Sequence, residues 1–290
     1  MSMVNLNELA ALVPDGAKLV VAKDESGVAM AATRELVRRH ARNLHLVTVP
    51  VSGLQADVLI GAGCVATLES SGITLSEFGT GPAFTRAVKA GTIKLKDGTC
   101  PAIYAGLQAA QKGIPFMPLR GIIGSDLLTH RDDWRVIDNP FGNDAKTADK
   151  TADKIVAIAA IQPDVALFHA PLADRFGNVF IGRQRELMLI AHAAKKTLVT
   201  VEQVIEGNLL DDDARSGATI PALYIEAIAH APRGMWPLGY HDAYSIDAAW
   251  MRAYVELART PAGFERFLAQ WLGDGSGLKP LVGADLRIPA

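Results

Sequence analysis

Two carboxylates stand where short apolar runs end, and carboxylates in such places can do chemistry. Glu202 follows the run LVTV, and Asp97 closes the run IKLKD. In an open parallel sheet, residues at the carboxyl ends of strands face the crevice that binds ligands. A carboxylate there can act as a base, a nucleophile or a positioning group. Each also has a structural alternative: Glu202 as a carboxylate paired structurally at a strand end, and Asp97, before Gly98-Thr99, as a turn former or helix cap.

An amide and an imidazole lie between these carboxylates in the sequence. Asn178 follows Gly177 in an Asp-x-x-Gly-Asn turn, and its amide can donate to a substrate carbonyl or to a developing oxyanion. The alternative is a turn asparagine in the left-handed backbone region. We interpret His169, at the end of DVALFHA, as a strand-end residue with one hydrogen-bond partner and not as a base. No histidines show the spacing of metal ligands, so no metal site is predicted.

A glycine-containing segment offers backbone amides to a ligand. Gly121, Gly124 and Ser125 belong to the run GIIGSD, which follows Arg120. Such amides can bind an anion, and an arginine can meet a carboxylate or phosphate in bidentate fashion. These four residues are therefore candidates for binding substrate or CoA, with a plain glycine turn as the alternative. The sequence holds no P-loop, no complete dinucleotide fingerprint and no G-x-S-x-G elbow.

Alternating strands and helices must position these residues. Between residues 164 and 202, the runs DVALFHA and TLVTVE flank a segment in which Leu187 and Ile190 fall on one helical face. This pattern predicts a strand, a crossover helix and a second, parallel strand. Further strands are predicted at 19–22, 44–51, 64–70 and 93–97, and further helices at 27–41, 54–62, 84–90 and 103–111. The alternation predicts an α/β fold with a mostly parallel sheet flanked by helices.

We expect one domain over residues 1–272. Asn7 is predicted to cap a short first helix. The polar stretch 128–153 interrupts the alternation and is interpreted as a surface excursion in which some apolar side chains need burial, namely Trp134, Val136, Ile137 and Phe141. Residues 247–272 are predicted to form C-terminal helices, the second opened by a proline, and the tail 273–290 has no clear periodicity.

The composition favours a globular protein that binds neither nucleic acid nor membranes. Of 290 residues, 49% are hydrophobic and 21% charged, and the formal net charge of −2 provides no basic field. Two cysteines are too few for a disulfide framework or a cysteine zinc site, so reduced thiols and a cytoplasmic location are expected. No apolar run reaches the ~18 residues typical of a membrane helix. The N-terminal segment lacks the basic residues of a secretory signal.

Three stretches carry a family resemblance: residues 56–95, 105–127 and 163–206. Their most specific parts are IPFMPLRGIIGSDL, and ADRFGNV followed by VTVE. All three resemble the A (alpha) subunit of family I CoA-transferases, of the glutaconate CoA-transferase type. Because residues 258–272 are similar to the closing helix of that subunit, the resemblance extends over roughly residues 14–272.

The resemblance implies the fold of the CoA-transferase and sugar-phosphate isomerase superfamily. It also implies an active site shared with a separate B (beta) subunit, with an acyl-CoA thioester and a carboxylic acid as substrates and no bound cofactor. In this family the acyl-CoA carbonyl is attacked by a glutamate of the B subunit, which forms an acyl-glutamyl anhydride and then carries CoA as a thioester. This chain would supply one wall, substrate-binding loops and an oxyanion donor.

Two departures from the family pattern leave alternatives open. The loop AKDESG, at 22–27, replaces the usual glycine pair, and Asp97-Gly98-Thr99 stands where relatives often carry Glu-x-Ser. A branch of the family resembles ring-opening hydrolases, which keep an acid near this position and lack the transferase glutamate. The alternatives are therefore a CoA-thioester or carbon–carbon hydrolase and, outside enzymes, a ligand-binding module on the same fold.

Overall fold

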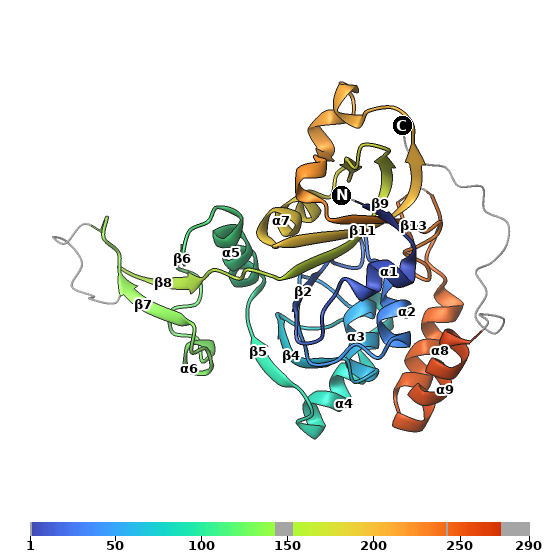
Figure 1. Ribbon diagram of the computed structural model, residues 1–290. Coiled ribbons are helices and arrows are strands. Elements are labelled where there is room, and N and C mark those ends of the chain that lie inside the picture. The colour runs from blue at the N-terminus through green and yellow to red at the C-terminus, as the bar shows by residue number, and fades with distance from the viewer. Residues whose placement is uncertain (1, 143–152, 242, 274–290) are drawn as a thin grey trace.

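A ten-stranded sheet forms the centre of the protein (Figure 1). The computed structural model describes residues 2–142, 153–241 and 243–273. Eight strands lie side by side in the order β1-β13-β11-β9-β2-β3-β4-β5, and each neighbouring pair is parallel. They are β1 (Ser2–Val4), β2 (Lys18–Val21), β3 (Leu44–Thr48), β4 (Val65–Ser70), β5 (Lys94–Asp97), β9 (Val165–Asp174), β11 (Lys196–Ile205) and β13 (Ala227–His230). Two short antiparallel strands extend this sheet: β10 (Val179–Phe180) pairs with β9, and β12 (Thr219–Ile220) pairs with β10.

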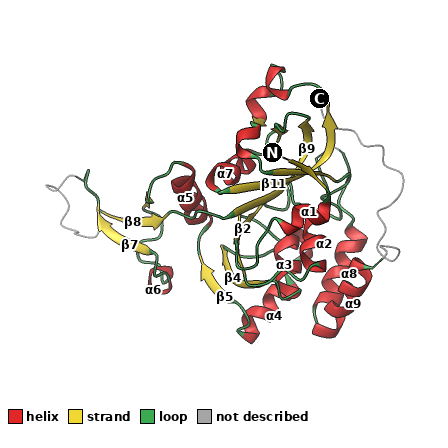
Figure 2. Cartoon of the chain, in the orientation of Figure 1, coloured by secondary structure: helices red, strands yellow, loops and turns green. Residues whose placement is uncertain are grey.

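Helices cover both faces of this sheet, as Figure 2 shows. One face carries α1 (Leu6–Ala11), α2 (Met30–Arg38), α3 (Leu54–Gly61), α4 (Pro82–Ala90), α8 (Ala248–Ala258) and α9 (Pro261–Leu272). The other face carries α5 (Cys100–Gln111) and α7 (Arg185–Ala193). The predicted α/β class with a mostly parallel sheet is confirmed.

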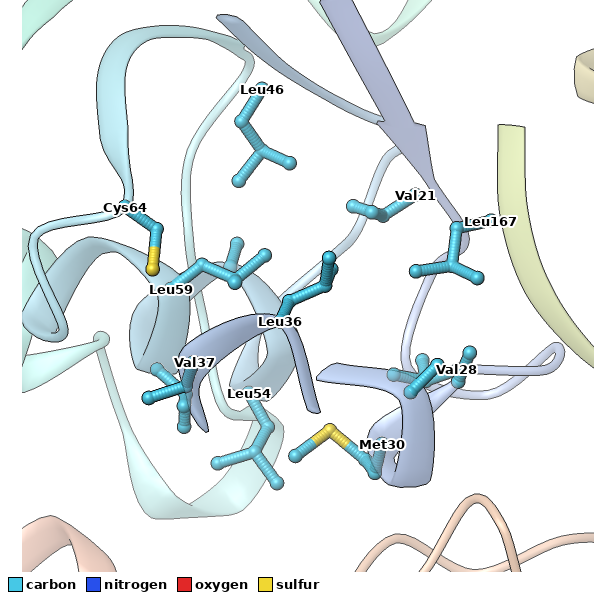
Figure 3. Packing of buried hydrophobic residues seen from close by; sticks show 14 of the residues in the cluster. Val21, Val28, Met30, Leu36, Val37, Leu46, Leu54, Leu59, Cys64 and Leu167 are labelled. Atoms are coloured by element: carbon cyan, nitrogen blue, oxygen red, sulfur yellow. The ribbon is translucent and has the colours of Figure 1, made fainter. Parts of the chain in front are cut away.

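The larger core lies between the sheet and the first of these helix layers. In Figure 3, Val21 and Leu46 of the sheet gather around the same space as Leu36 of α2 and Leu59 of α3. All four side chains are fully buried. Burying one such aliphatic side chain contributes roughly 1.5–3 kcal/mol, so this layer fixes the strands whose ends carry the polar residues.

The expected elements are present, but several boundaries differ. Asn5, not Asn7, caps the first helix: its side chain accepts the N–H of Glu8, and the Glu8 side chain accepts the N–H of Asn5. The second helix begins at Met30, later than expected. Gly27 explains the delay, because its φ of +153° is not helical and a Cβ there would lie 2.2 Å from the His169 carbonyl oxygen.

A three-stranded antiparallel sheet projects from the main body beyond α5 (Figure 1). Its strands are β6 (Phe116–Leu119), β7 (Trp134–Asp138) and β8 (Lys154–Ala159), in the order β6-β8-β7, with the short helix α6 (Leu127–His130) beside them. The surface excursion predicted for residues 128–153 therefore begins earlier in the chain and has strands of its own. Trp134 is buried as expected, but Phe141 is 93% exposed and Val136 is 49% exposed, so the expected burial of these two residues was wrong. Residues 143–152 of that excursion, and the tail from 274 onward, lie outside the described residues.

Candidate active site

The carboxyl ends of β2, β3, β4 and β5 form one edge of the sheet, and polar groups collect along it. Asp97 ends β5 and pairs in register with Ser70 at the end of β4. Its side chain is exposed, and its Oδ1 accepts the N–H of Gly98 at 2.9 Å. No other described residue donates a hydrogen bond to the Asp97 carboxylate. Asp97 therefore presents an accessible carboxylate oxygen at this edge.

The turn after Asp97 leads directly into α5. Thr99, and not Asp97, caps this helix, because the Thr99 hydroxyl accepts the N–H of Ala102 at 3.3 Å. The exposed thiol of Cys100 lies 3.3 Å from the hydroxyl of Ser71, the residue after β4. A hydroxyl and a thiol thus meet just beyond the ends of β4 and β5, three residues or fewer from Asp97 or Ser70 in the chain.

A network of charged side chains around Arg131 connects β5 to β4. Arg131 follows α6 and donates to Glu69 of β4 at 2.5 Å and to Asp133 at 2.8 and 3.0 Å. It also donates to the backbone carbonyls of Lys96 and Asp97 at 3.3 and 3.1 Å. Burial alone would raise the pKa of Glu69, but a hydrogen bond from His45 and the charge of Arg131 hold that pKa below its usual range. Sequence reasoning missed Arg131, whose only signal was a charged stretch that looked like solvent-exposed surface.

The loop 22–27, after β2, is tied down at several points. Asp24 accepts the N–H groups of Gly53 and Leu54, at the start of α3, at 2.9 and 3.0 Å. Burial raises the pKa of Asp24 to about 7, although these two amides act in the opposite direction. These hydrogen bonds hold the loop 22–27 against the start of α3.

On the α5 and α7 side of the same edge lies a second polar group. The Tyr104 hydroxyl of α5 donates to the carbonyl of Pro50 at 3.4 Å. Burial raises the pKa of Tyr104, and the nearby charges of Glu186 and Cys100 add to the effect. The Lys23 ammonium lies 3.2 Å from Oε1 of Glu186, in the first turn of α7. The sequence alone did not single out these side chains, because they come from four separate segments.

Glu202 lies in the interior, contrary to the predicted strand-end position. β9 and β11 run on to Asp174 and Ile205, so both His169 and Glu202 are mid-strand residues. The Glu202 carboxylate is 1% exposed and accepts from the Tyr244 hydroxyl and the Arg233 N–H, each at 2.7 Å. It also lies 2.9 Å from Nε2 of His169.

The histidine completes this buried network. Nδ1 of His169 lies 2.8 Å from the Thr200 hydroxyl, and His169 is fully buried. The expectation of one hydrogen-bond partner was wrong, since both ring nitrogens are engaged. Burial would raise the pKa of Glu202, but the hydrogen bond and charge of His169, with the Arg233 and Tyr244 donors, hold it below its ordinary value. The carboxylate is therefore fully partnered within the fold.

Asn178 serves a buried turn. Its side-chain amide donates to Asp174 at 2.8 Å and to Asn208 at 3.1 Å, and its Oδ1 accepts the N–H of Ala222 at 2.9 Å. Both amide hydrogens are thus already used within the chain. Its 4% exposure leaves little access for a substrate, and its role as an oxyanion donor remains a prediction that this arrangement does not favour.

The glycine-containing segment belongs to the projecting part of the chain, between β6 and α6. Arg120, Gly121, Gly124 and Ser125 follow β6 in the projecting sheet, and Arg120 pairs with Asp153 at 3.0 Å. None of the described contacts joins them to Asp97, Asn178 or Glu202. Their role in binding substrate or CoA remains a prediction.

The described residues show neither a metal cluster nor a membrane helix. No group of three or more His, Cys, Asp or Glu side chains among them is arranged to hold a metal ion. None of the described helices has the length and apolar character needed to cross a bilayer.

Comparison with known proteins identifies the family. The family model described as Coenzyme A transferase matches residues 3–231. The chain belongs to the coenzyme A transferase family. It is 30% identical over 250 residues to the A subunit of the 3-oxoadipate CoA-transferase of Pseudomonas knackmussii, covering 83% of both chains. The resemblance seen in the sequence is confirmed.

Two further proteins are similar to this chain over most of their length. The crystal structure of glutaconate coenzyme A-transferase from Acidaminococcus fermentans superposes with a TM-score of 0.85 at 26% identity, covering 100% of this chain and 99% of that one. The cholesterol ring-cleaving hydrolase IpdA subunit of Rhodococcus jostii is 29% identical over 248 residues, covering 84% of this chain and 82% of that one. This chain is accordingly an A subunit of the heteromeric CoA-transferase type.

Proposed function

We propose that this chain and a B subunit together move CoA from an acyl-CoA donor to a carboxylic acid, with the attacking glutamate supplied by the B subunit. The burial of Glu202 is the observation that carries the proposal. A carboxylate that is 1% exposed and accepts from Tyr244 and Arg233 cannot reach a thioester without breaking these bonds. The exposed edge around Asp97 offers polar groups that can contact a substrate, but a partner has to complete the reaction chamber.

The proposed reaction has four steps. The B-subunit glutamate attacks the thioester carbonyl, and CoA leaves as a thiolate, which gives an acyl-glutamyl anhydride. The thiolate then attacks the glutamyl carbonyl, so the donor acid leaves and a glutamyl-CoA thioester remains. The acceptor carboxylate then attacks the glutamyl-CoA thioester, which releases the CoA thiolate and forms a second acyl-glutamyl anhydride. The thiolate attacks the acyl carbonyl of this anhydride, so the new acyl-CoA leaves and the glutamate is restored. A carboxylate is a weak nucleophile in water, so the edge of this chain would help to exclude water and to position the carbonyl.

The test uses this chain co-expressed with its B subunit. CoA transfer from an acyl-CoA to free acetate is expected from the complex and not from either chain alone. Hydroxylamine should trap the glutamyl-CoA thioester as a hydroxamate on the B chain, which mass spectrometry detects. Transfer catalysed by the isolated A chain would contradict the proposal.

Asp97 supports a second candidate, a hydrolase that acts on a CoA thioester. Its exposed carboxylate can accept a proton from water, and one relative is named as a ring-cleaving hydrolase. In this case Asp97→Asn in the complex should lower the rate of CoA release by hydrolysis at least 100-fold. For the transferase, the same change should leave transfer within about tenfold of the unmodified complex. Asp133→Asn, at a carboxylate held by Arg131 and Lys96, is the control for effects on the charge network.

A further inference from the structure

One lysine, Lys23, follows β2, the strand at which the order of strands in the sheet reverses. From β2, the strands β3, β4 and β5 follow on one side, and β9, β11 and β13 on the other. Ligands of open parallel sheets bind outside the carboxyl ends of the strands at such a switch point. Lys23 is the second residue after β2, so its side chain begins at that place.

The Lys23 ammonium has a charged neighbour but no hydrogen bond. It lies 3.2 Å from Oε1 of Glu186, and the two side chains are 30% and 12% exposed. That oxygen is buried and accepts no hydrogen bond from the described residues. The contact is thus an ion pair without hydrogen-bond geometry, and the three ammonium hydrogens have no acceptor among the described residues.

The backbone that carries Lys23 is rigid. The N–H and the hydroxyl of Ser26 both donate to the Lys23 carbonyl, each at 3.1 Å. Asp24 is anchored to the start of α3, and the carbonyl of Gly27 accepts the N–H of His169 at 2.7 Å. A cation on such a fixed turn is pre-organised, so little ordering is needed when a ligand binds.

We propose that Lys23 binds the free carboxylate of a dicarboxylic acyl group. The inference rests on the proposed function and specifies its substrate class. β2 and β5 are separated by three strand spacings, about 14 Å, and Lys23 and Asp97 follow or end these strands at the same carboxyl edge of the sheet. A carboxylate supplies the acceptors that the ammonium lacks. The two transferase relatives are named for 3-oxoadipate and glutaconate, both of which are dicarboxylates.

Equilibrium binding separates this inference from the transfer reaction itself. Calorimetry on the two-subunit complex compares glutarate with pentanoate, which has the same chain length and only one carboxylate. We expect the complex to prefer glutarate, and Lys23→Met to weaken glutarate binding by between about 10-fold and 100-fold, as for a hydrogen bond to a charged group. Pentanoate binding should not change.

Three further variants serve as controls. Lys195 forms a hydrogen-bonded, more exposed ion pair with Asp164 at 2.8 Å, before β9 and β11 begin, so Lys195→Met should leave both ligands unaffected. Glu186→Gln removes the competing carboxylate and should strengthen glutarate binding severalfold. Lys23→Met combined with Glu186→Leu removes both charges. This double variant shows whether a loss of binding in Lys23→Met arises only because an unpaired Glu186 destabilises the fold.

The outcomes are distinct. An unchanged preference for glutarate in Lys23→Met and in the double variant overturns the inference, as does a complex without that preference. If glutarate binds through Lys23 but no CoA transfer occurs with any acyl donor, the carboxylate site stands and the proposed function fails. If transfer occurs and Lys23 has no effect on the choice of acid, the proposed function stands and the inference fails.

Discussion

Replacement of Glu202 by glutamine tests whether this carboxylate is structural. Glu202 accepts three hydrogen bonds in the core, from His169, Tyr244 and the backbone of Arg233. Glutamine has nearly the same shape, but it has no charge and carries one oxygen in place of two. At least one buried donor then faces an amide N–H, which also donates.

The expected loss follows from these contacts. A hydrogen bond to a charged group contributes about 1.5–3 kcal/mol, and an unsatisfied buried donor costs about 1–3 kcal/mol. Because glutamine keeps part of the network, we expect a loss of about 3 kcal/mol in the free energy of unfolding. At roughly 2–3 °C per kcal/mol for a protein of this size, the Tm falls by roughly 6–9 °C.

The pH dependence adds a second check. The pKa of Glu202 is lowered in the folded protein, so its contribution is present above the ordinary value of 4.5 and is lost as the pH falls through the folded pKa. The stability difference between the original protein and Glu202→Gln should therefore be largest near neutral pH and shrink below about pH 4.5.

Urea unfolding and activity of the complex together decide the matter. The midpoint should fall with an unchanged slope, and kcat at low temperature should stay within about tenfold, since the side chain is only 1% exposed. An unchanged midpoint together with a 1,000-fold loss of kcat would refute the structural assignment and return Glu202 to the catalytic residues.

Two further substitutions test other buried charges. The folded pKa of Asp24, about 7, lies above its ordinary value of 3.8, so the free energy of unfolding should fall as the pH rises from about 4 to 7, by up to about 1.4 kcal/mol per pH unit. Thermal melts of Asp24→Asn should show a weaker dependence of stability on pH over this window. An identical dependence in the variant would contradict the raised pKa. Arg131→Met leaves Glu69 buried without its arginine and should lower the free energy of unfolding in urea by about 3–5 kcal/mol. Adding Glu69→Met should recover at least half of that loss. A double variant as unstable as the single one would exclude an unpaired buried charge as the cause.

Much of the fold could be predicted because the hydrophobic spacing follows the burial. Leu187 and Ile190 were expected on one face of a helix, and both are fully buried in α7. The chemistry was harder to locate. A run such as LVTVEQVI has no turn residue to mark where its strand stops, so Glu202 was placed at an end that lies three residues further on, at Ile205.

The polar edge could be found only in part. Asp97 was identifiable because Gly98 and Thr99 mark the end of its strand. Lys23 and Glu186 are far apart in the sequence, and their contact follows from the packing of α7 beside the end of β2. Arg131 likewise meets Glu69 only through the tertiary fold, so no local spacing indicates the pair.

The position of β2 in the middle of the sheet has a consequence for synthesis on the ribosome. Its residues Leu19, Val20 and Val21 are fully buried, and they pair with Val165–Leu167 of β9. Until that later segment has emerged, the nascent chain can assemble β2 to β5 with an apolar, unpaired border. Unpaired borders of this kind recruit strands from other molecules, so a partly synthesised chain is most exposed to aggregation before β9 pairs with β2.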